Sequence, residues 1–232
     1  MTAAGRLGVG IIGAGRVGPV LGAGLAAAGH AITGISTVSD AGRDRAQALL
    51  PDAPILEIPQ LVERSELVLL AIPEGELEAL VSGLAATETW MPGQLVMHTA
   101  PGFGYGVLGP ALSRGAIPLA VHPAMSFTGT SMDLVRLRES FCAVTAPTPV
   151  LPIAQALVVE LGAEPVIVAE ADRPAYAEAI TTATSFSSEI VRQSIELLGG
   201  IGLEHPGAVI APLVRSAVEN ALQSPPPAAF PE

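Results

Sequence analysis

The chain carries LGVGIIGAGRVG at residues 7–18, an apolar segment that leads directly into three glycines, Gly13, Gly15 and Gly18. At this spacing the first glycine permits a tight turn from strand to helix, the second lets a diphosphate approach the backbone, and the third lets helix and strand pack together. The phosphates can then bind free N–H groups at the positive end of the helix. We therefore predict a dinucleotide-binding loop, formed by Gly13, Ala14, Gly15, Arg16, Val17 and Gly18.

The residues around the loop decide between a nucleotide site and an empty turn. Three glycines alone are weak evidence in a chain with 25 glycines, and a glycine-rich turn without a ligand is the alternative. Val9, Ile11 and Ile12 form an apolar strand before the turn. The apolar segment after it ends at Gly29 and has Pro19 in its first turn, as a helix allows. The order of strand, turn and helix favours dinucleotide binding.

The composition excludes several classes of function. The 232 residues carry 22 acidic and 11 basic side chains, for a net charge of −11, and all 11 bases are arginine. Nucleic-acid binding needs a clustered basic face, so we expect no nucleic-acid partner. The absence of lysine excludes Schiff-base chemistry and a P-loop lysine.

Cysteine and charge distribution bear on the compartment. The single cysteine, Cys142, cannot form an intrachain disulfide, which favours a reducing compartment. Residues 17–39 carry no charge, but their glycines fit a strand–helix–strand unit better than a membrane span or a signal sequence. We expect a soluble, cytoplasmic protein with no membrane partner.

Apolar and helical segments alternate along most of the chain, which predicts an α/β fold with a Rossmann-type, doubly wound, mostly parallel sheet. The segment at 67–72 has no polar alternation, as expected of a central parallel strand that is covered on both faces. The pattern predicts strands at 31–36, 55–58, 67–72, 94–99, 117–122, 140–145 and 165–168, and helices at 44–50, 60–66, 76–84, 107–113 and 152–161.

The pattern changes to all-helical after about residue 170. Asp172 can cap a long apolar helix that continues to about residue 198, and Pro212 should kink or split a second helix at 206–222. These helices are too apolar to stand alone in water, so we expect a homodimer formed through them. We divide the chain into a dinucleotide-binding domain at 1–170, a small helical domain for substrate binding or dimerisation at 171–223, and a proline-rich tail at 224–232.

The end of the second strand indicates which dinucleotide binds. Sites for NAD usually place an acidic residue there to hold the ribose 2′-hydroxyl. Here the strand ends in Ser36 and Thr37, with Arg43 and Arg45 nearby, a set that suits the 2′-phosphate of NADP. The arginines can also be ordinary surface residues, and Asp40 would favour NAD if the strand were longer. We expect NADP, with NAD as the alternative.

Ligands of open parallel sheets lie beyond the carboxyl ends of the strands. We expect further cofactor contacts at two of these ends, formed by Ala71, Ile72 and Pro73 and by His98 and Thr99. A third end carries His122, followed by a loop with the hydroxyls of Ser126 and Thr128 that can orient a carboxylate or carbonyl oxygen. With a pKa near neutrality, His122 can donate a proton during hydride transfer to a carbonyl or imine. The alternative, weighed equally, is that His122 hydrogen-bonds the loop backbone and serves only to position Thr128.

Tyr176, on the long helix, can reach the same crevice with its hydroxyl, although such a tyrosine is more often part of a core. The candidate catalytic residues are therefore His122, Ser126, Thr128 and Tyr176. No spacing typical of a metal site is present, so we expect no metal.

Four segments together resemble a known group of proteins: GIIGAGRVG (10–18), LVLLAIP (67–73), HTA (98–100) and HPAMSFTGT (122–130). The group consists of Rossmann-like proteins whose C-terminal half is a domain of unknown function, similar in plan to pyrroline-carboxylate reductase, ketopantoate reductase and the phosphogluconate dehydrogenase superfamily. The resemblance implies a nucleotide-binding domain, a helical domain that often dimerises, and NADP-dependent reduction. The chain departs from the group at Ser185-Phe186, where members tend to carry Asn-His, at its proline-rich end, and in lacking the lysine of the hydroxyacid dehydrogenases.

Two functions follow as hypotheses. The first is an NADP-dependent oxidoreductase that reduces a C=O or C=N bond of a small substrate, one that carries a carboxylate, such as a 2-keto acid or a cyclic imine. The second is a non-catalytic NADP(H)-binding sensor or regulatory protein, in which the loop after His122 only shapes a pocket.

Overall fold

A computed structural model describes residues 6–223, which divide into one compact unit that ends at Ile180 and another that begins at Thr181. Helix α8 (Arg173–Thr181), which follows the predicted boundary near residue 170, belongs to the first unit up to Ile180. Its first residue, Arg173, is buried there with 0% of its surface exposed. The functional division at residue 170 stays a prediction, and the predicted tail at 224–232 lies outside the described residues.

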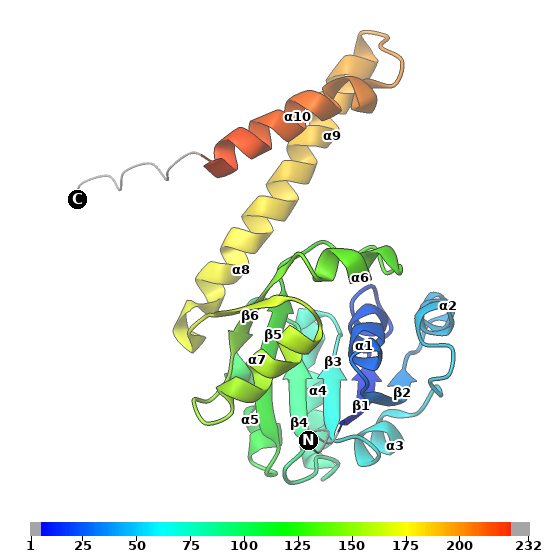
Figure 1. Cartoon of the computed structure of the whole chain (residues 1–232), viewed down its shortest axis with the longest axis vertical. Helices are drawn as coiled ribbons and strands as arrows, with labels where there is room; N and C mark the ends of the chain where they lie inside the picture. The colour runs from blue at the N-terminus through cyan, green and yellow to red at the C-terminus, as the bar shows by residue number, and fades with distance from the viewer. Residues whose placement is uncertain (1–5, 224–232) are drawn as a thin grey trace, which may run out of the picture. The chain divides into compact units, whose positions relative to one another are not determined.

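The first unit contains a seven-stranded sheet with the order β2-β1-β3-β4-β5-β6-β7. The strands from β2 to β5 are parallel, β6 is antiparallel to β5, and β7 is parallel to β6 (Figure 1). The predicted α/β fold with a mostly parallel, doubly wound sheet is therefore confirmed. The strands are β1 (Gly8–Ile12), β2 (Ala31–Ser36), β3 (Leu67–Leu70), β4 (Leu95–His98), β5 (Ile117–Pro123), β6 (Phe141–Thr145) and β7 (Glu164–Ile167).

Helices cover both faces of the sheet, and an apolar core lies under each layer. One layer contains α1 (Gly18–Ala27), α2 (Asp40–Leu49), α6 (Met132–Leu137) and α7 (Leu151–Glu160). The other contains α3 (Ile58–Glu63), α4 (Glu74–Ala86), the 3₁₀ turn η1 (Tyr105–Leu108) and α5 (Gly109–Leu112). Buried strand residues such as Ile11 and Leu69 fill the first core, and Val68 and Leu70 fill the second. Because β3 is buried on both faces, its sequence shows no polar alternation.

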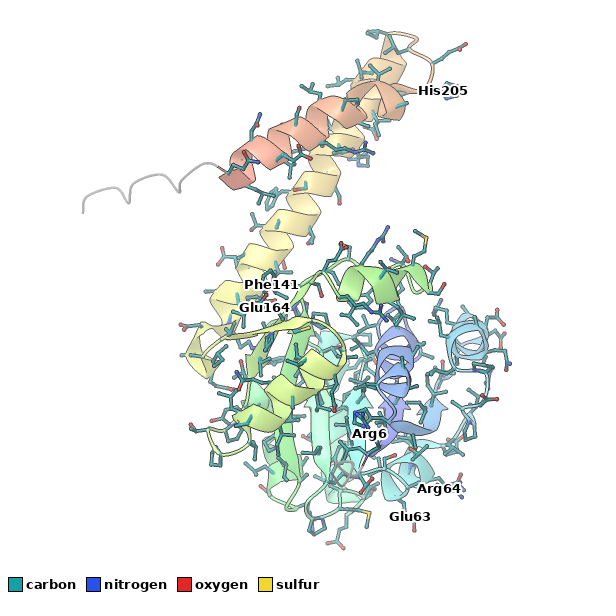
Figure 2. All side chains as sticks on the ribbon, in the orientation of Figure 1. Arg6, Glu63, Arg64, Phe141, Glu164 and His205 are labelled. Carbon is teal, nitrogen blue, oxygen red and sulfur yellow. The ribbon has the colours of Figure 1, made fainter. Side chains whose placement is uncertain are left out.

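Three elements differ from the sequence prediction. The predicted strand at 55–58 is wrong: Ile55 makes only an isolated bridge with Ile35, and α3 already begins at Ile58, where Pro59 occupies its first turn. Helix α6 was not predicted. Strict alternation of strands and helices would make every strand parallel, but β6 runs antiparallel to β5. The reason is that the chain after β5 enters β6 at the same end of the sheet at which β5 ends. Figure 2 labels Arg6, just before β1, at one end of the sheet, and Phe141 and Glu164, which begin β6 and β7, at the other.

The second unit is helical. A π-helical segment at Thr182–Phe186 leads into α9 (Ser187–Gly200), and a loop that contains His205 (Figure 2) leads into α10 (Pro206–Gln223), which packs on α9. Pro212 does not split the predicted helix, because α10 is a single helix that continues through it. Within residues 6–223, no helix has both the length and the hydropathy that a membrane span requires.

Candidate functional site

The strand order reverses near one edge of the sheet, where β1 lies between the edge strand β2 and β3. In doubly wound sheets, ligands bind at this point, just beyond the carboxyl ends of the strands. Gly13 follows β1 there and donates its N–H to the carbonyl of Ser36, at the end of β2, at 3.0 Å. Ala71 follows β3 and donates its N–H to the carbonyl of Ile12 at 2.9 Å. The glycine loop is therefore fixed to both neighbouring strands.

The three glycines of the loop have different steric roles. A Cβ atom at Gly13, where φ is +105°, would collide with the carbonyl oxygen of Ala71, and one at Gly18 would collide with the carbonyl oxygen of Gly13. A Cβ atom at Gly15 would have nothing within 4 Å. Since the fold itself requires Gly13 and Gly18 but leaves the space over Gly15 open, Gly15 is the position at which another molecule can approach the backbone.

Helix α1 begins directly behind this open space. Its N-cap residue, Val17, provides no side-chain hydrogen bond to the first turn, and Pro19 lies in that turn without an N–H group. The first N–H groups of a helix have no partner within the helix and attract negative charge. The open space over Gly15 and the uncapped helix end together fit a diphosphate.

A cavity of about 390 Å³ lies at this edge of the sheet. It brings together eight of the predicted cofactor-binding residues: Gly13, Ala14, Gly15, Ser36, Thr37, Ala71, Ile72 and Pro73. Arg45, which the sequence places with Arg43 near the 2′-phosphate, also lines the cavity, and six further lining residues are not among the predictions: Ile12, Val38, Ser39, Ile58, Glu76 and Leu80. Of these, Glu76 and Leu80 come from α4, one helical turn apart after Pro73. Their spacing is the signal that could have indicated them.

The end of β2 has the features expected for a phosphorylated ribose. The strand ends at Ser36, and Asp40 lies beyond the N-cap residue Ser39, with a fully exposed side chain whose carboxylate is 3.7 Å from the guanidinium of Arg43. Arg45 lines the cavity and donates from Nε to the carbonyl of Ala14 at 3.0 Å, whereas Arg43 does not line it. Of the two arginines expected near the 2′-phosphate, the structure therefore brings Arg45 to the cavity and not Arg43.

A second cavity, of about 270 Å³, is lined by Arg16, the residue that follows Gly15 of the first cavity. Arg16, Val17 and Thr99 from the cofactor-binding prediction and His122 from the catalytic prediction line it. Its other lining residues are Pro123, Met125 and Phe127.

The ring of His122 is paired with Tyr176. Its Nδ1 atom lies 2.8 Å from the Tyr176 hydroxyl, and the two rings meet edge to face with centroids 5.6 Å apart and an interplanar angle of 77°. Within residues 6–223, the Nε2 atom of His122 makes no hydrogen bond, so Nε2 is the ring nitrogen left for a ligand in the second cavity.

Burial, and secondarily the charge of Arg173, lower the pKa of His122 to about 4. This value differs from the near-neutral pKa expected from the sequence, because a strand end under a packed helix is less solvated than an open crevice. At neutral pH the ring is uncharged. A neutral imidazole whose Nδ1 accepts from the Tyr176 hydroxyl carries its proton on Nε2.

Arg173 lies over the ring of Tyr176. Its guanidinium carbon is 5.7 Å from the centre of the Tyr176 ring. Its Nε donates to the Thr145 hydroxyl at 2.7 Å, and one terminal nitrogen donates to the carbonyls of Ala120 and Ala143, both at 3.1 Å. Burial lowers the pKa of Arg173, and Tyr176 and Glu170 oppose this effect.

The hydroxyl-rich loop after His122 has a different position from the one expected. Ser126 and Thr128 are exposed and do not line the second cavity. Instead, the carboxylate of Asp133, which is fully buried, accepts from the Thr128 hydroxyl at 3.0 Å and from the N–H groups of Thr128 and Gly129 at 2.7 and 2.8 Å. Despite the opposing effect of burial, these bonds hold the pKa of Asp133 below its ordinary value. Thr128 thus stabilises its own loop.

His98, predicted as a cofactor contact, is buried and bonded to the backbone on both sides. Its Nε2 atom donates to the carbonyl of Gly104 at 2.8 Å, and its Nδ1 atom accepts from the N–H of Ala100 at 3.2 Å. Burial lowers its pKa to about 4, although the bond to Gly104 opposes the shift. His98 therefore shapes the loop that follows β4 and does not reach either cavity, whereas its neighbour Thr99 does.

Comparisons with known proteins identify the families that the chain matches. Residues 2–123 match the family model of the Rossmann-like domain, and residues 140–231 match that of a domain of unknown function, DUF2520. A comparison with curated protein sequences gives no match.

Several solved structures are similar in fold. A protein from Bacteroides fragilis that is described as an NADP oxidoreductase superposes with a TM-score of 0.76 at 19% sequence identity, over 98% of this chain and 85% of that one. An imine reductase from Streptomyces aurantiacus has a TM-score of 0.71 at 16% identity, over 93% and 74% of the two chains. A 1-pyrroline-5-carboxylate reductase from Streptococcus pyogenes has a TM-score of 0.69 at 18% identity, over 96% and 82%. At these identities the likeness shows the fold.

Proposed function

We propose, from the premise that this chain belongs to the Rossmann-like domain family, that it is an NADP-dependent oxidoreductase that reduces a C=O or C=N bond of a small, carboxylate-bearing substrate. The observation that carries the proposal is that two consecutive residues of the glycine loop, Gly15 and Arg16, line two different cavities. The second of these is also lined by the His122 ring, which is hydrogen-bonded to Tyr176. The similar solved structures described as NADP oxidoreductase, imine reductase and pyrroline-carboxylate reductase support the same class of reaction.

The first cavity has the groups that a dinucleotide needs. The backbone at Gly15 and the start of α1 would hold the diphosphate. Ser39, the N-cap residue of α2, and Arg45, within α2, line this cavity together with Ser36 at the end of β2, where a ribose 2′-phosphate would bind, and no acidic residue ends that strand. These features favour NADP over NAD. When bound, NADPH supplies a hydride to the carbon of the substrate double bond.

The residues of the second cavity would then supply the proton. As the carbon gains the hydride, the electron pair of the C=O or C=N bond moves to oxygen or nitrogen, which takes the proton from Nε2 of His122. The Nδ1 atom of His122 takes the proton of the Tyr176 hydroxyl, 2.8 Å away. His122 ends neutral and Tyr176 ends as a phenolate that solvent reprotonates. This relay avoids a free imidazolium, which the lowered pKa of His122 disfavours.

Arg16 supports a substrate that carries a negative charge. It is the one residue with a positive charge among those that line the second cavity. A guanidinium can bind a carboxylate through two parallel hydrogen bonds, which would orient the substrate relative to His122. The other lining side chains include the apolar Val17, Met125 and Phe127, which suit a small aliphatic body.

The experiment is NADPH oxidation by the purified protein against a panel of 2-keto acids and cyclic imines. We expect turnover with at least one member, and His122→Ala should lower kcat by about 100-fold or more, the usual contribution of a positioned acid. Tyr176→Phe should lower kcat similarly. Both variants should bind NADPH with nearly unchanged Kd, because neither residue lines the first cavity.

The alternative function gives a different result. A protein that only senses or sequesters NADP(H) would bind NADPH tightly and turn over no member of the panel. Turnover that is insensitive to both His122→Ala and Tyr176→Phe would overturn the proposed relay while leaving the reductase intact.

We also propose that the protein is a homodimer formed through its second unit. Helices α9 and α10 expose large apolar side chains, among them Ile190, Leu197 and Leu213, each with more than half of its surface exposed. A pair of helices with so much exposed apolar surface gains stability when a second copy covers it.

A further inference from the structure

Arg173 is a buried cation without a carboxylate partner. None of its surface is exposed, and no ion pair joins it to an acidic residue within residues 6–223. Its hydrogen bonds go to neutral oxygens, those of Thr145, Ala120 and Ala143, and one terminal nitrogen has no partner among the described residues. Glu170 lies shortly before Arg173 in the sequence but does not pair with it. Its carboxylate instead accepts from the N–H groups of Tyr105 and Gly106, both at 2.9 Å.

A buried charge in this condition is costly, because burial removes its hydration and neutral acceptors only partly replace it. The charge would be stabilised by a negative group that forms close by. Arg173 faces the ring of Tyr176, at 5.7 Å from its centroid. The proposed proton relay leaves a negative charge on the oxygen of that same ring.

We propose that Arg173 is a positioning residue that acts through Tyr176: its buried charge stabilises the Tyr176 phenolate that remains when the proton has passed through His122 to the substrate. The role of Arg173 in turnover rests on the proposed reductase function. The effect of Arg173 on the ionisation of Tyr176 needs neither cofactor nor substrate. Arg173 touches neither cavity. Its effect is to make the phenol a better acid than its buried surroundings would otherwise allow.

The other groups around Tyr176 do not substitute for this charge. Burial raises the pKa of Tyr176, Arg173 opposes the increase, and Cys142 of β6 adds to it. His122 of β5 and His98 of β4 both have pKa values lowered to about 4, so they are neutral at physiological pH. Among the nearby carboxylates, Glu170 binds the 105–106 backbone, and Glu74 of α4 accepts from Gly102, which lies against Ala177 of α8. Arg173 is therefore the one positive group acting on the phenol within the described part of the chain.

The chain allows a direct measurement. It contains two tyrosines, Tyr105 and Tyr176, so Tyr105→Phe leaves Tyr176 as the only phenol. In that background, biosynthetic incorporation of fluorotyrosine gives a single ¹⁹F signal whose shift with pH reports the ionisation of Tyr176, without cofactor or substrate. Fluorination lowers the pH range of the titration and so keeps the protein under milder conditions.

The variants are Arg173→Met and Arg173→Lys. Methionine keeps an apolar stem and removes the charge, and we expect it to raise the ionisation midpoint of Tyr176 by about one pH unit or more. Lysine keeps the charge but cannot reproduce the hydrogen bonds to Thr145, Ala120 and Ala143. We expect the Tyr176 midpoint in Arg173→Lys to stay close to the wild-type value. A purely structural role predicts that both variants behave alike.

Thr145→Val is the matched control. It removes the hydrogen bond that Thr145 accepts from Arg173 but leaves the charge in place, so the Tyr176 midpoint should not move. Equal midpoints in the wild type and in folded Arg173→Met would overturn the inference. If Arg173→Met does not fold, a midpoint in Arg173→Lys raised by more than about one pH unit would overturn it equally.

Activity provides a second, separable readout. If the panel of substrates gives turnover, Arg173→Met should lower kcat with little change in KM, and Arg173→Lys should restore part of the loss. If no substrate is turned over, the proposed function fails, but the ¹⁹F titration still decides whether Arg173 controls Tyr176.

Discussion

The Nδ1 atom of His122 lies 2.8 Å from the hydroxyl of Tyr176, which is 54 residues further along the chain. One residue belongs to the end of a sheet strand and the other to the first helix after the sheet. When Nδ1 accepts from this hydroxyl, the neutral imidazole carries its proton on Nε2, the ring nitrogen left for the second cavity. The chemistry that we propose depends on this contact and on the glycine loop beside it, and the following variants test both.

Gly15→Ala should separate ligand binding from folding. A Cβ atom at Gly15 meets nothing within 4 Å, so the variant should keep its stability to within about 0.5 kcal/mol. The added methyl group occupies the space over the backbone where the diphosphate is expected, so the Kd for NADPH should rise about tenfold or more. Calorimetric titration and thermal melting measure the two effects.

Two other glycines serve as comparisons for Gly15→Ala. Gly18→Ala should destabilise the fold, because its Cβ atom would collide with the carbonyl of Gly13. Gly75→Ala, in which the Cβ atom also meets open space but outside both cavities, should change neither stability nor binding. NADPH binding to Gly15→Ala as tight as to the wild type would contradict the assignment of the loop.

Arg45→Ala should weaken NADPH binding selectively. Arg45 lines the first cavity and is held by its bond to the carbonyl of Ala14. If it holds the 2′-phosphate, its loss should raise the Kd for NADPH about tenfold, as for a lost charge-assisted hydrogen bond, and leave the Kd for NADH nearly unchanged. The same titrations on Arg43→Ala discriminate between the two arginines. A larger effect there would show that the phosphate binds Arg43, the other arginine that the sequence places at this site.

The sequence predicts the helix that carries Arg45 but not which of the two arginines, Arg43 or Arg45, faces the cavity. Residues two apart on a helix point in nearly opposite directions, so the choice between Arg43 and Arg45 depends on where the helix begins. The predicted start was residue 44, whereas α2 begins at Asp40 after the N-cap Ser39. An uncertainty of a few residues at a helix end is therefore enough to exchange the buried and exposed faces.

The glycine loop and the central strand were predictable for a local reason. The strand at 7–12, the glycines after it and the unbroken apolar segment at 67–72 are each specified by neighbouring residues. The direction of β6 and the pairing of His122 with Tyr176 are not, because they depend on the path of the chain between distant segments. For the same reason, sequence patterns predicted a strand at 55–58, where Ile55 forms only one bridge.

His98 should make the fold sensitive to acid. Its pKa is lowered to about 4 by burial, whereas the unfolded chain binds the proton near the ordinary value of 6.5. The stability that the neutral ring provides is complete above pH 6.5 and is lost as the pH falls from 6.5 toward 4, because only the unfolded state then binds a proton. Between pH 7 and pH 5 this loss amounts to about 2 kcal/mol for one such histidine.

His98→Gln should reduce that sensitivity. Glutamine retains an amide donor for the Gly104 carbonyl but does not titrate. The difference in free energy of unfolding between pH 7 and pH 5, measured by urea denaturation, should shrink by about 2 kcal/mol. His205→Asn, at an exposed position with a positive φ that asparagine tolerates, is the control and should leave the difference unchanged. An unchanged difference in His98→Gln would contradict the depressed pKa.

The oligomeric state tests the second unit separately. Light scattering should give the mass of a dimer, and the double variant Ile190→Glu/Leu197→Glu should give a monomer, because it places two charges on the exposed apolar face of α9. Val135→Glu alters an equally exposed residue of α6 in the first unit and should leave the dimer intact. A monomeric wild-type protein would exclude the proposed dimer.

Calorimetric titration of the wild-type protein with NADPH and with NADH addresses the central claim directly. We predict saturable binding of one NADPH per chain, with a Kd on the order of micromolar and tighter than that for NADH. If the folded protein bound neither nucleotide, the space over Gly15 would be an empty turn and the proposed reductase would be excluded.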